Sequence, residues 1–393
     1  MNILIVHNYY RIPGGEDVVV RNESVLLEEA GHKVFLYTRH NKELNDMRLS
    51  EKLTLPVSVI YSRRTYNEIS RLIKDNSIDI IMVHNTLMLI SPSVYYAAVE
   101  LGVPVIQTIH NFRLLCPAAT FYRKGHICED CLHKGLGCAV LNRCYRDSFV
   151  FTLACVLSMK YHRRRRIYGR INYICLTGFG KEKLLLLQGV KEERVFIKPN
   201  YTKTERDFVP YGERELSFVY AGRLDESKGV KEILYAWENM GETAPLLYLC
   251  GTGPLTGWCK GYIREKGLKQ VIFKGFLEHD EMLGLVANAK ALLLPSKWYE
   301  GLPMTMIEAF SVGTPVIGSD LGNVGSALEE GLGVRIDMDR GAEAVKEAVA
   351  LFIQKPGRFV YDESVFRSAA KRYGDKENIK ILNRIFDIVS KQG

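Results

Sequence analysis

The sequence predicts an α/β protein with two doubly wound parallel sheets, one in each half of the chain. Short apolar runs, which predict strands, alternate with segments of helical periodicity along the whole chain. Loops containing glycine or polar residues follow several of these runs, as they do where parallel sheets bind ligands. The length of 393 residues allows two domains that each bury their own core.

The composition, 47% hydrophobic and 25% charged, is that of an ordinary globular protein. The net charge of +8 indicates an anionic partner without distinguishing nucleotide, anionic lipid and nucleic acid. Met1-Asn2 leads directly into an apolar strand, and no apolar run has membrane-spanning length, so we expect a cytoplasmic protein without a signal peptide. The nine cysteines should then be reduced thiols or metal ligands.

The chain opens with a βαβ unit. A strand at 2–7 is followed by a loop ending in Pro13-Gly14-Gly15, an amphipathic helix to about Ala30 and a second strand at 33–37. Gly14 and Gly15 at a helix start would let a phosphate or a sugar approach the backbone, although such a pair is more often only a turn. No G-x-G-x-x-G follows the strand, so a dinucleotide fingerprint is absent.

Two further strands, at 78–83 and 103–109, end at His84-Asn85 and His110-Asn111. Helical segments at 66–74 and 91–101 separate them, as a doubly wound sheet requires. Because His110 ends a strand at the edge where such sheets bind ligands, it is a candidate for substrate contact. A hydrogen bond from this histidine to a loop is an equally good interpretation.

Five cysteines lie between positions 116 and 144. Cys128 and Cys131 form a C-x-x-C, and with Cys116 and Cys144 they could hold a structural zinc ion in a reduced compartment. Cys138 could replace any one of the four. The alternative, a long insertion with unpaired and partly buried thiols, stands beside this prediction.

An apolar run at 148–159 is followed at once by the basic cluster 160–166. The run is too short to span a bilayer, but an apolar helix joined to basic residues could lie in an anionic membrane surface. It could equally be a buried helix with a solvated basic end. A strand at 173–176 and a helix at 179–188 precede Pro199-Asn200 and the polar run 202–207, which predict a domain linker.

The second half begins with a strand at 216–220 and a loop that contains Gly222, Arg223 and Lys228. An arginine and a lysine five residues apart at a helix start can converge on an anion, and glycine allows its close approach. Gly253 follows the next strand, at 246–250, and Phe276 follows the strand at 271–274. Isolated charges of this kind are otherwise usually solvated.

The stretch 289–320 predicts a strand, a loop, a helix and a second strand of a parallel sheet. Glu300 lies in the loop and Glu308 on the helix, which starts near Pro303 and ends at Gly313. The backbone N–H groups at the start of the helix could hold an anion between the two carboxylates. Each glutamate alone would rather be a solvated or capping residue. The residues that supply this helix start are Gly301, Leu302, Pro303 and Met304.

The pair is more specific than its members. Glu300, seven residues and Glu308 resemble the E-x7-E signature of retaining glycosyltransferases, in particular glycosyltransferase family 4. The loop G-R-x-x-x-x-K-G from Gly222 to Gly229 is similar to the pyrophosphate clamp of that family. The resemblance extends over the whole chain and is strongest in its second half.

The resemblance implies the GT-B architecture, in which two Rossmann-like domains face a cleft. Residues 1–199 would form the acceptor-side domain and residues 200–375 the nucleotide-sugar domain, with a helix at 376–393 packed back on the first. Asp337-Met338-Asp339 has the D-x-D spacing of metal-dependent transferases, but it lies far along the chain from the clamp. We therefore interpret it as the start of a helix and expect that catalysis requires no metal or other cofactor.

The implied function is transfer of a sugar from a nucleoside diphosphate sugar to an acceptor hydroxyl with retention of configuration. Arg223 and Lys228 would stabilise the diphosphate charge. Glu308 would bind the ribose, Phe276 would lie in the loop that accepts the base, and Gly253 and Gly222 would line the nucleotide. Glu300 and the helix start would hold the sugar. Gly14, Gly15 and His110 would close the site from the other domain.

The implied acceptor is a lipid-linked oligosaccharide or another saccharide of bacterial surface polysaccharide synthesis. The protein would then work at the inner face of the cell membrane, on an anionic surface, with no nucleic acid partner. Three other functions remain open at this point: a glycoside hydrolase that uses Glu300 and Glu308 as acid and nucleophile, a sugar-nucleotide epimerase of the same fold and a non-catalytic nucleotide-binding module. The basic clamp counts against the hydrolase, because hydrolases bind no diphosphate.

Overall fold

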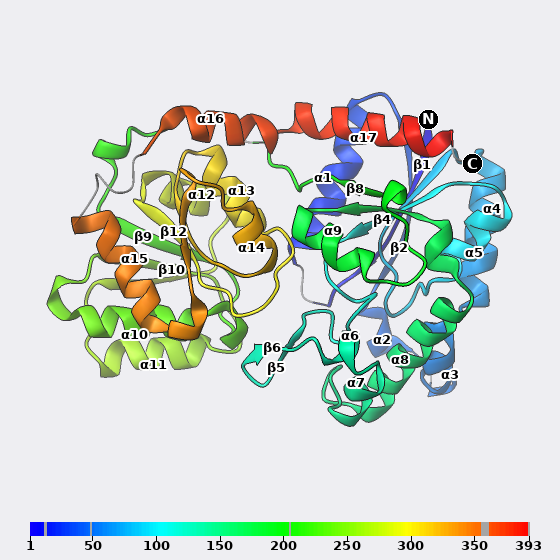
Figure 1. The fold of residues 1–393 in the computed structure, drawn as a ribbon, viewed down its shortest axis with the longest axis horizontal. Coiled ribbons are helices and arrows are strands. Elements are labelled where there is room, and N and C mark those ends of the chain that lie inside the picture. The colour runs from blue at the N-terminus through cyan, green and yellow to red at the C-terminus, as the bar shows by residue number, and fades with distance from the viewer. Residues whose placement is uncertain (12–13, 48, 204–205, 355–360, 392–393) are drawn as a thin grey trace. The chain divides into compact units, whose positions relative to one another are not determined.

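The structure is a computed structural model of the chain, and it describes residues 1–11, 14–47, 49–203, 206–354 and 361–391. Pro13, positions 204–205 of the predicted linker and the last two residues of the closing helix lie outside the described residues. Contacts divide the chain into two compact units, and Figure 1 labels most of their elements. The first unit is Met1–Arg123, Cys128–Pro199 and Asn378–Gly393, and the second is Lys124–Ile127 and Asn200–Glu377.

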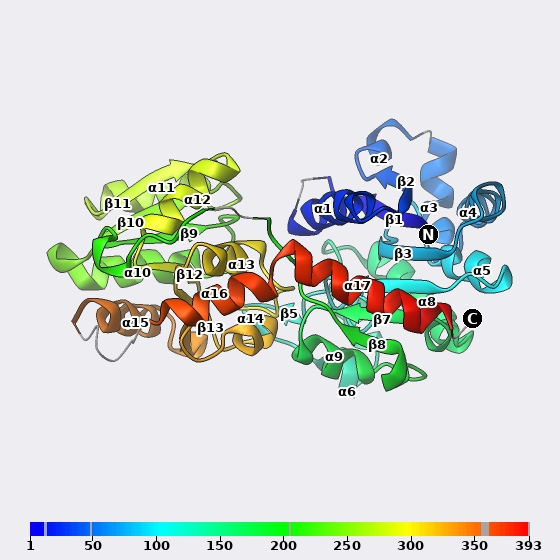
Figure 2. The same ribbon diagram turned by 90° about the horizontal axis from the view of Figure 1, so that it is seen from above.

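The first unit contains a six-stranded sheet whose described pairs are all parallel. Its strands are β1 (Asn2–Tyr9), β2 (Lys33–His40), β3 (Ile80–Asn85), β4 (Val105–Ile109), β7 (Asn172–Cys175) and β8 (Val195–Ile197). Their spatial order is β2-β1-β3-β4-β7-β8, and Figure 2 labels all of these strands except β4. The order reverses between β1 and β3, so the carboxyl ends of these strands and of β4 form the edge where ligands bind in such sheets.

Helices and loops cover this sheet, and β3 and β7 are buried at every position. The helices are α1 (Gly15–Glu29), α2 (Glu43–Asp46), α3 (Leu49–Ile60), α4 (Arg63–Asn76), α5 (Ser93–Glu100), α6 (Asp130–His133), α7 (Gly137–Leu141), α8 (Phe149–Arg164), α9 (Gly178–Leu185) and α17 (Asp375–Ser390). A short hairpin of β5 (Tyr122–Arg123) and β6 (His126–Ile127) precedes α6. Strands buried on both faces need mainly apolar sequences, which is why the sequence predicted these two strands from their apolar residues.

The helix α17 packs on the first unit from Asn378 onward. Its buried apolar residues, Leu382, Ile385, Phe386 and Val389, recur at helical spacing. The Asn378 side chain donates to the Pro199 carbonyl at 2.9 Å, which ties the helix to the last residue of the first unit before the chain crosses to the second.

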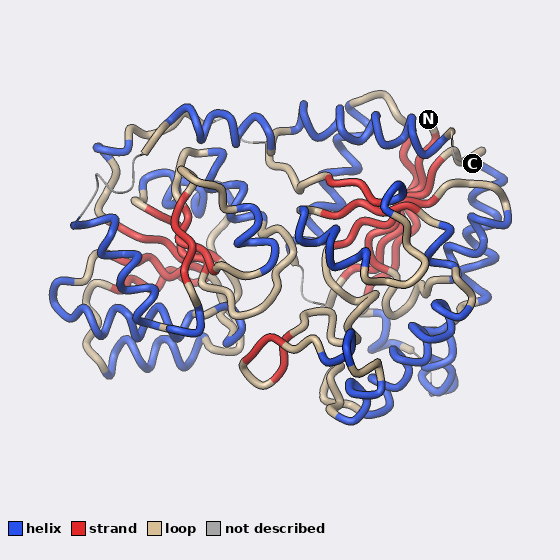
Figure 3. The backbone as a smooth tube through the Cα atoms, viewed as in Figure 1, coloured by secondary structure: helices blue, strands red, loops and turns tan. Residues whose placement is uncertain are grey.

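The second unit repeats the architecture. Its parallel strands are β9 (Ser217–Ala221), β10 (Leu246–Cys250), β11 (Val271–Gly275), β12 (Ala291–Leu294), β13 (Val316–Ser319) and β14 (Gly333–Ile336). Their order is β11-β10-β9-β12-β13-β14, which reverses between β9 and β12. Figure 3 draws both six-stranded sheets in red. The two doubly wound parallel sheets predicted from the sequence are therefore confirmed.

Helices cover both faces of the second sheet, as Figure 1 shows. On one face lie α10 (Val230–Met240), α11 (Thr256–Glu265) and α15 (Ala342–Gln354), and on the other α12 (His279–Asn288), α13 (Met304–Ser311), α14 (Gly322–Ala327) and α16 (Glu363–Arg372). Trp237 and Phe218 pack edge to face in the core beneath α10. This rigid core holds the loops at the carboxyl ends of β9 and β12 in place.

Some local predictions need adjustment. Pro303 is the N-cap of α13, with extended backbone at φ −62° and ψ 131°, and the helix begins one residue later. The side chain of Asp337 caps a 3₁₀ turn at Met338–Arg340, just before α15, by accepting from the Asp339 N–H at 2.9 Å. None of the helices that the described residues form combines the length and hydropathy needed to cross a bilayer.

Candidate active site

The loops after β9 and β12 meet at the carboxyl edge of the second sheet, where the strand order reverses. The Lys228 ammonium lies 2.6 Å from Glu300 Oε1, and the Lys297 N–H donates to the Ser227 carbonyl at 2.8 Å. Two sequence motifs 72 residues apart thus form one site. The side chain of Lys228 remains 27% exposed, so its charge stays within reach of a ligand.

Glu300 is held firmly in this site. Its side chain is 8% exposed, and Oε1 accepts from Ser296 Oγ at 2.6 Å and from Trp298 Nε1 at 2.7 Å in addition to Lys228. The Lys228 ammonium also stands 5.1 Å from the centre of the Trp298 ring, a cation–π distance. Glu300 is therefore a buried and oriented carboxylate and not a solvated surface acid.

Arg223 lies on the same loop as Lys228 but is more exposed. Its side chain is 54% exposed, and its guanidinium lies 3.8 Å from Asp225. Asp225 in turn caps the 3₁₀ turn Glu226–Lys228, accepting from the Ser227 N–H at 3.1 Å. The loop is rigid at its base, and the arginine can reorient toward an anion.

Glu308 lies on α13 with its side chain 8% exposed, and its Oε1 is 3.2 Å from Nε2 of the half-exposed His279. Burial raises the pKa of Glu308, and the nearby His279 opposes this effect. Glu308 neither caps the helix nor faces water, so the alternative that the sequence left open for it is wrong. A buried carboxylate with a single imidazole neighbour retains capacity to accept hydrogen bonds from hydroxyl groups.

The N-terminus of α13 faces the same loop. No side chain caps it and its first turn carries no acidic residue, so the first N–H groups keep the partial positive charge of a helix start. Gly301 is half-buried, as are Pro303 and Met304. Leu302 is 3% exposed and its carbonyl accepts from Asn200 at 2.8 Å, so only its backbone can serve a ligand.

The glycines of this edge are explained first by packing. A Cβ at Gly253 would lie 2.4 Å from the Leu224 carbonyl oxygen, because the loops after β9 and β10 run against each other. Gly222 is less constrained, since its Cβ would meet the Tyr220 hydroxyl at 3.3 Å. Gly229, which sequence analysis did not select, has φ +71° and leaves no room for a Cβ beside the Pro295 carbonyl. Phe276, after β11, is 72% exposed.

In the first unit, Gly14 is the N-cap of α1 and Gly15 its first residue. The Asp17 carboxylate accepts from the Gly14 N–H at 3.0 Å, and a Cβ at Gly14 would meet nothing within 4 Å. The helix start is therefore open, but Asp17 already occupies part of its hydrogen-bonding capacity.

His110 follows β4 and is half-buried. Its Nε2 lies 2.9 Å from Nδ1 of His84, which ends β3, and the two rings are nearly parallel. Burial and the neighbouring His84 hold the pKa of His110 well below its usual value. The imidazole is thus neutral at physiological pH.

Sequence analysis did not single out the polar residues beneath His110. His84 is 4% exposed, and Glu23 of α1 and Lys198 after β8 are almost fully buried. The His84-Asn85 pair at a strand end was visible in the sequence and was a usable signal. Glu23 gave none, because a glutamate inside an amphipathic helix normally faces water.

The predicted zinc ligands lie in one region without forming a metal centre. Burial, followed by the nearby Cys116 and Cys144, raises the pKa of Cys131 to about 12. Cys131 and Cys144 pack against an apolar cluster that includes Val156 and Met159. Among the described residues, no three His, Cys, Asp or Glu side chains are grouped closely enough to hold a metal ion. The zinc site, including Cys128, stays a prediction.

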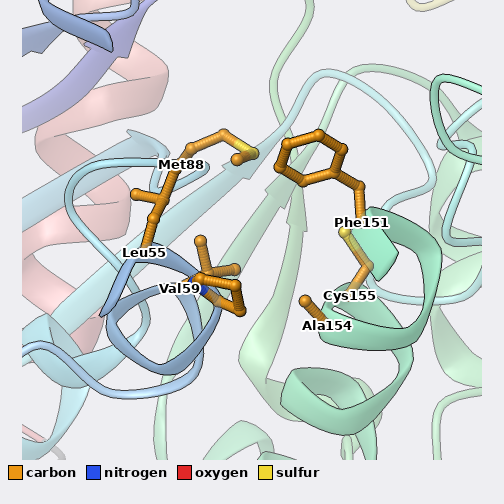
Figure 4. Close-up of a pocket in the computed structure, with 7 residues that line it drawn as sticks. Leu55, Val59, Met88, Phe151, Ala154 and Cys155 are labelled. Atoms are coloured by element: carbon orange, nitrogen blue, oxygen red, sulfur yellow. The ribbon is translucent and has the colours of Figure 1, made fainter. Parts of the chain in front are cut away.

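Part of the apolar run and of the basic cluster around α8 is not exposed, as binding to a membrane surface would require. Part of α8 is buried, and Arg163 is half-buried: its guanidinium donates to the Leu114 carbonyl at 2.7 Å and burial lowers its pKa. Figure 4 shows an apolar pocket between α3 and α8, lined by Leu55, Val59, Met88, Phe151, Ala154 and Cys155. This pocket contains none of the predicted site residues.

Two family models match the chain. The family described as Glycosyltransferase Family 4 matches residues 13–206, and the family described as Glycosyl transferases group 1 matches residues 202–373. Among curated relatives, a lipopolysaccharide 1,6-galactosyltransferase of Salmonella typhimurium is 31% identical over 156 residues, which is 38% of this chain and 43% of the relative. A glycogen synthase of Mycobacterium tuberculosis is 34% identical over 116 residues, 29% of this chain and 28% of the relative. The matches span less than half of either relative.

Solved structures are similar over the full length. Sucrose-phosphate synthase from Thermosynechococcus elongatus aligns with a TM-score of 0.68 at 16% identity and covers 100% of both chains. HepE from Anabaena in complex with UDP aligns with a TM-score of 0.67 at 15% identity, over 98% of this chain and 99% of its own. At such identities the likeness establishes the fold, which is GT-B. With the two family models it leads to one conclusion: the chain belongs to glycosyltransferase family 4 and is a glycosyltransferase.

Proposed function

We propose that this glycosyltransferase moves a sugar from a nucleoside diphosphate sugar to an acceptor hydroxyl with retention of anomeric configuration. The observation that carries the proposal is the Lys228–Glu300 contact at the switch point of the second sheet. It joins a cation that can bind phosphate to a carboxylate that can bind sugar hydroxyls, next to an uncapped helix start that also favours anions.

In this reaction the bond between the sugar C1 and the β-phosphate oxygen breaks, and a bond from C1 to the acceptor oxygen forms on the same face. The acceptor proton passes to the leaving phosphate, so no protein nucleophile is required. Lys228 and Arg223 stabilise the charge that grows on the diphosphate. Glu308 accepts from the ribose hydroxyls, and Glu300 and the start of α13 hold the sugar.

Release of nucleoside diphosphate that depends on an added acceptor tests this function. UDP sugars are the first donors to assay, because HepE, which shares the fold, is described in complex with UDP. A thermal-shift panel of UDP, GDP, ADP and dTDP identifies the base. A hydrolase would release sugar without an acceptor, an epimerase would interconvert donors without one, and a binding module would release nothing.

For the acceptor we propose a lipid-linked oligosaccharide of a bacterial surface polysaccharide. The relatives support this class, since they include the lipopolysaccharide galactosyltransferase and a putative teichuronic acid biosynthesis glycosyltransferase of Bacillus subtilis. The glycogen synthase match suggests a storage polysaccharide as the other acceptor class. Comparing sugar transfer onto a lipid-linked oligosaccharide with transfer onto soluble glycogen distinguishes the two classes of acceptor.

A lipid-linked acceptor calls for attachment to an anionic membrane surface, and the exposed residues before and at the start of α8 suit it. Phe149 and Val150 are 52% and 59% exposed, and the nearby Leu141 is 85% exposed. Arg143 and Arg146 are exposed in the intervening loop. Apolar side chains beside arginines favour the interface of an anionic bilayer.

Vesicle flotation tests this attachment. A Phe149→Ser, Val150→Ser double variant should lose binding to phosphatidylglycerol vesicles at low salt, while turnover on a short soluble acceptor stays unchanged. A Leu186→Ser variant is the matched control, because Leu186 is also 58% exposed but lies after α9. Wild-type protein that ignores the vesicles, or equal loss in the control, contradicts the attachment.

We also propose a structural zinc ion that draws Cys116, Cys128, Cys131 and Cys144 together, because the described residues do not group them closely enough to hold a metal by themselves, while catalysis needs no metal. Elemental analysis of the purified protein should give about one zinc per chain, and EDTA should leave the initial turnover unchanged. Absence of stoichiometric zinc rejects the structural site. Turnover that EDTA abolishes and magnesium restores rejects metal-independent catalysis.

A further inference from the structure

A line of buried polar residues in the first unit ends at His110. Lys198 Nζ lies 2.8 Å from Glu23 Oε1, and Glu23 Oε2 lies 3.1 Å from His84 Nε2. His84 Nδ1 lies 2.9 Å from His110 Nε2. The side chains of Lys198, Glu23 and His84 are at most 1% exposed, and the distances between them are those of direct contact. Each of these groups therefore lies within electrostatic reach of the next.

The charge of this line follows from its composition. Burial alone would raise the pKa of Glu23, but the charge of Lys198 and the contact with His84 outweigh it and hold the pKa well below its usual value. Glu23 is thus a carboxylate, and Lys198 neutralises it. Because Lys198 already balances the charge of Glu23, the buried site favours an uncharged imidazole at His84.

The position of the protons follows next. A lone pair on His84 Nε2 would face the Glu23 carboxylate at 3.1 Å, which is repulsive, so the proton of His84 lies on Nε2. His84 Nδ1 then carries a lone pair and accepts the hydrogen bond that His110 Nε2 donates. Because His110 is neutral, its remaining nitrogen, Nδ1, carries a lone pair.

We propose that Glu23 and Lys198 are positioning residues for the transfer reaction: through His84 they fix His110 as the Nε2-protonated tautomer, whose Nδ1 accepts a hydrogen bond from a substrate hydroxyl. The role of His110 toward substrate rests on the proposed function, whereas its tautomer does not. The hydroxyl belongs to the donor sugar or to the acceptor, and the kinetic arms below distinguish the two. Without the Glu23 carboxylate, His84 could carry its proton on either ring nitrogen. In the molecules where His84 Nδ1 is protonated, it would donate to His110 Nε2, and His110 Nδ1 would carry a proton and could no longer accept a hydrogen bond.

The first experiment needs no variant. Proton-coupled ¹⁵N spectra of histidine side chains, assigned with His84→Gln and His110→Asn variants, should show both imidazoles neutral with the proton on Nε2. A cationic His84, or a proton on Nδ1 of His110, overturns the inference whatever the activity of the protein. Absence of any sugar transfer by the wild-type protein would instead count against the proposed function.

The second experiment removes both charges of the buried pair. A Glu23→Gln, Lys198→Met double variant leaves no unpaired buried charge, so it should fold, with a loss of stability limited to the hydrogen bond that Lys198 donates to Asn378 Oδ1 at 3.2 Å. Its His110 should show a mixture of tautomers, and kcat should fall about 10- to 100-fold, as when a reacting group is misplaced slightly. A rise in KM for the sugar nucleotide shows that the hydroxyl bonded to His110 belongs to the donor sugar. A rise in KM for the acceptor shows that it belongs to the acceptor. UDP affinity should not change.

Two comparisons separate positioning from a general effect on the fold. Glu68→Gln, which removes a half-buried carboxylate of α4 that accepts from Tyr37 at 2.5 Å, is the matched control and should keep wild-type kcat. When His110 is already asparagine, the Glu23→Gln, Lys198→Met changes should reduce kcat no further, because they act through His110. The positioning role is wrong if the Glu23→Gln, Lys198→Met changes reduce kcat by the same factor in the His110→Asn protein as in the wild-type protein. It is also wrong if these changes leave the kcat of the otherwise wild-type protein unchanged.

Discussion

Each unit contains a lysine–glutamate pair near its sheet edge, and the two pairs differ in exposure. Lys228 and Glu300 of the second unit approach to 2.6 Å with the lysine 27% exposed. Lys198 and Glu23 of the first unit approach to 2.8 Å with both side chains at most 1% exposed. The same ion pair is accessible to a ligand in one unit and sealed from it in the other.

This difference separates two roles for one kind of contact. A partly exposed pair contributes about 0–1 kcal/mol, so a diphosphate can share its lysine at little cost. A sealed pair costs about 3–5 kcal/mol to break by removal of one partner, so it keeps its geometry whatever binds nearby. The first pair suits a binding site, and the second suits the orientation of a neighbouring group.

The comparison fails most directly if the two lysines contribute equally to stability. Lys198→Met should lower the free energy of unfolding by about 3–5 kcal/mol, because Glu23 is left as a buried unpaired charge. Lys228→Met should lower it less, because Glu300 keeps its hydrogen bonds from Ser296 and Trp298 when the lysine is removed. Urea titrations of both variants measure this, and similar midpoints for the two would contradict the distinction. Because the folded-state pKa of Glu23 is lowered, its contribution should persist above pH 4.5 and be lost as the pH falls toward that lowered pKa.

The lysine of the exposed pair, Lys228, should matter more for turnover than for stability. Lys228→Ala and Arg223→Ala should each lower turnover roughly 100- to 1,000-fold, because charge grows on the diphosphate only as the glycosidic bond breaks. Lys231→Ala is the matched control: it removes a lysine three positions further on, which pairs with the exposed Glu226, and should leave turnover unchanged. Near-normal turnover in both clamp variants with an intact fold would refute their role.

Glu308 provides a test by pH within the second unit. Glu308→Gln should weaken nucleotide binding by about 1.5–3 kcal/mol, the contribution of hydrogen bonds to a charged acceptor. Burial raises the pKa of Glu308, so the carboxylate takes up a proton at a higher pH than usual. As the pH is lowered, the affinity of the wild-type protein for the nucleotide should therefore begin to fall while the pH is still above 4.5. The variant should lose this pH dependence. The raised pKa also means that stability falls as the pH rises from 4.5 through the folded-state pKa. Calorimetric titration of UDP from pH 5 to pH 8 measures the effect, and parallel curves for both proteins would rule it out.

The smallest expected effect concerns the loops that carry the clamp. Gly253→Ala should destabilise the second unit by roughly 1–3 kcal/mol, because its Cβ would meet the Leu224 carbonyl at 2.4 Å. Gly257→Ala, in α11 with nothing within 4 Å of its Cβ, should be neutral or slightly stabilising. Thermal unfolding compares the pair, and equal midpoints would show that Gly253 is not required by packing.

Much of the fold could be predicted from local pattern. The apolar runs at 291–294 and 316–318 indicated strands because a strand buried on both faces needs apolar residues at every position. The reversal of strand order could not be predicted in this way, since periodicity reports burial and not the neighbour of a strand. The short helix α2 was missed for a related reason: four residues are too few to show a helical period.

Of the candidate site, the sequence determined the residue types and their place at strand ends, through the spacing of Glu300 and Glu308 and the loop from Gly222 to Gly229. Only the tertiary structure decided which charges meet: Lys228 with Glu300, and Glu23 with Lys198, 175 positions further along the chain. It also decided that Arg163 is half-buried and bonded to the Leu114 carbonyl while Phe149 is exposed. The physical reason is that a charged side chain has the same local pattern whether water or a distant partner solvates it, and only the crossing of strands brings that partner near.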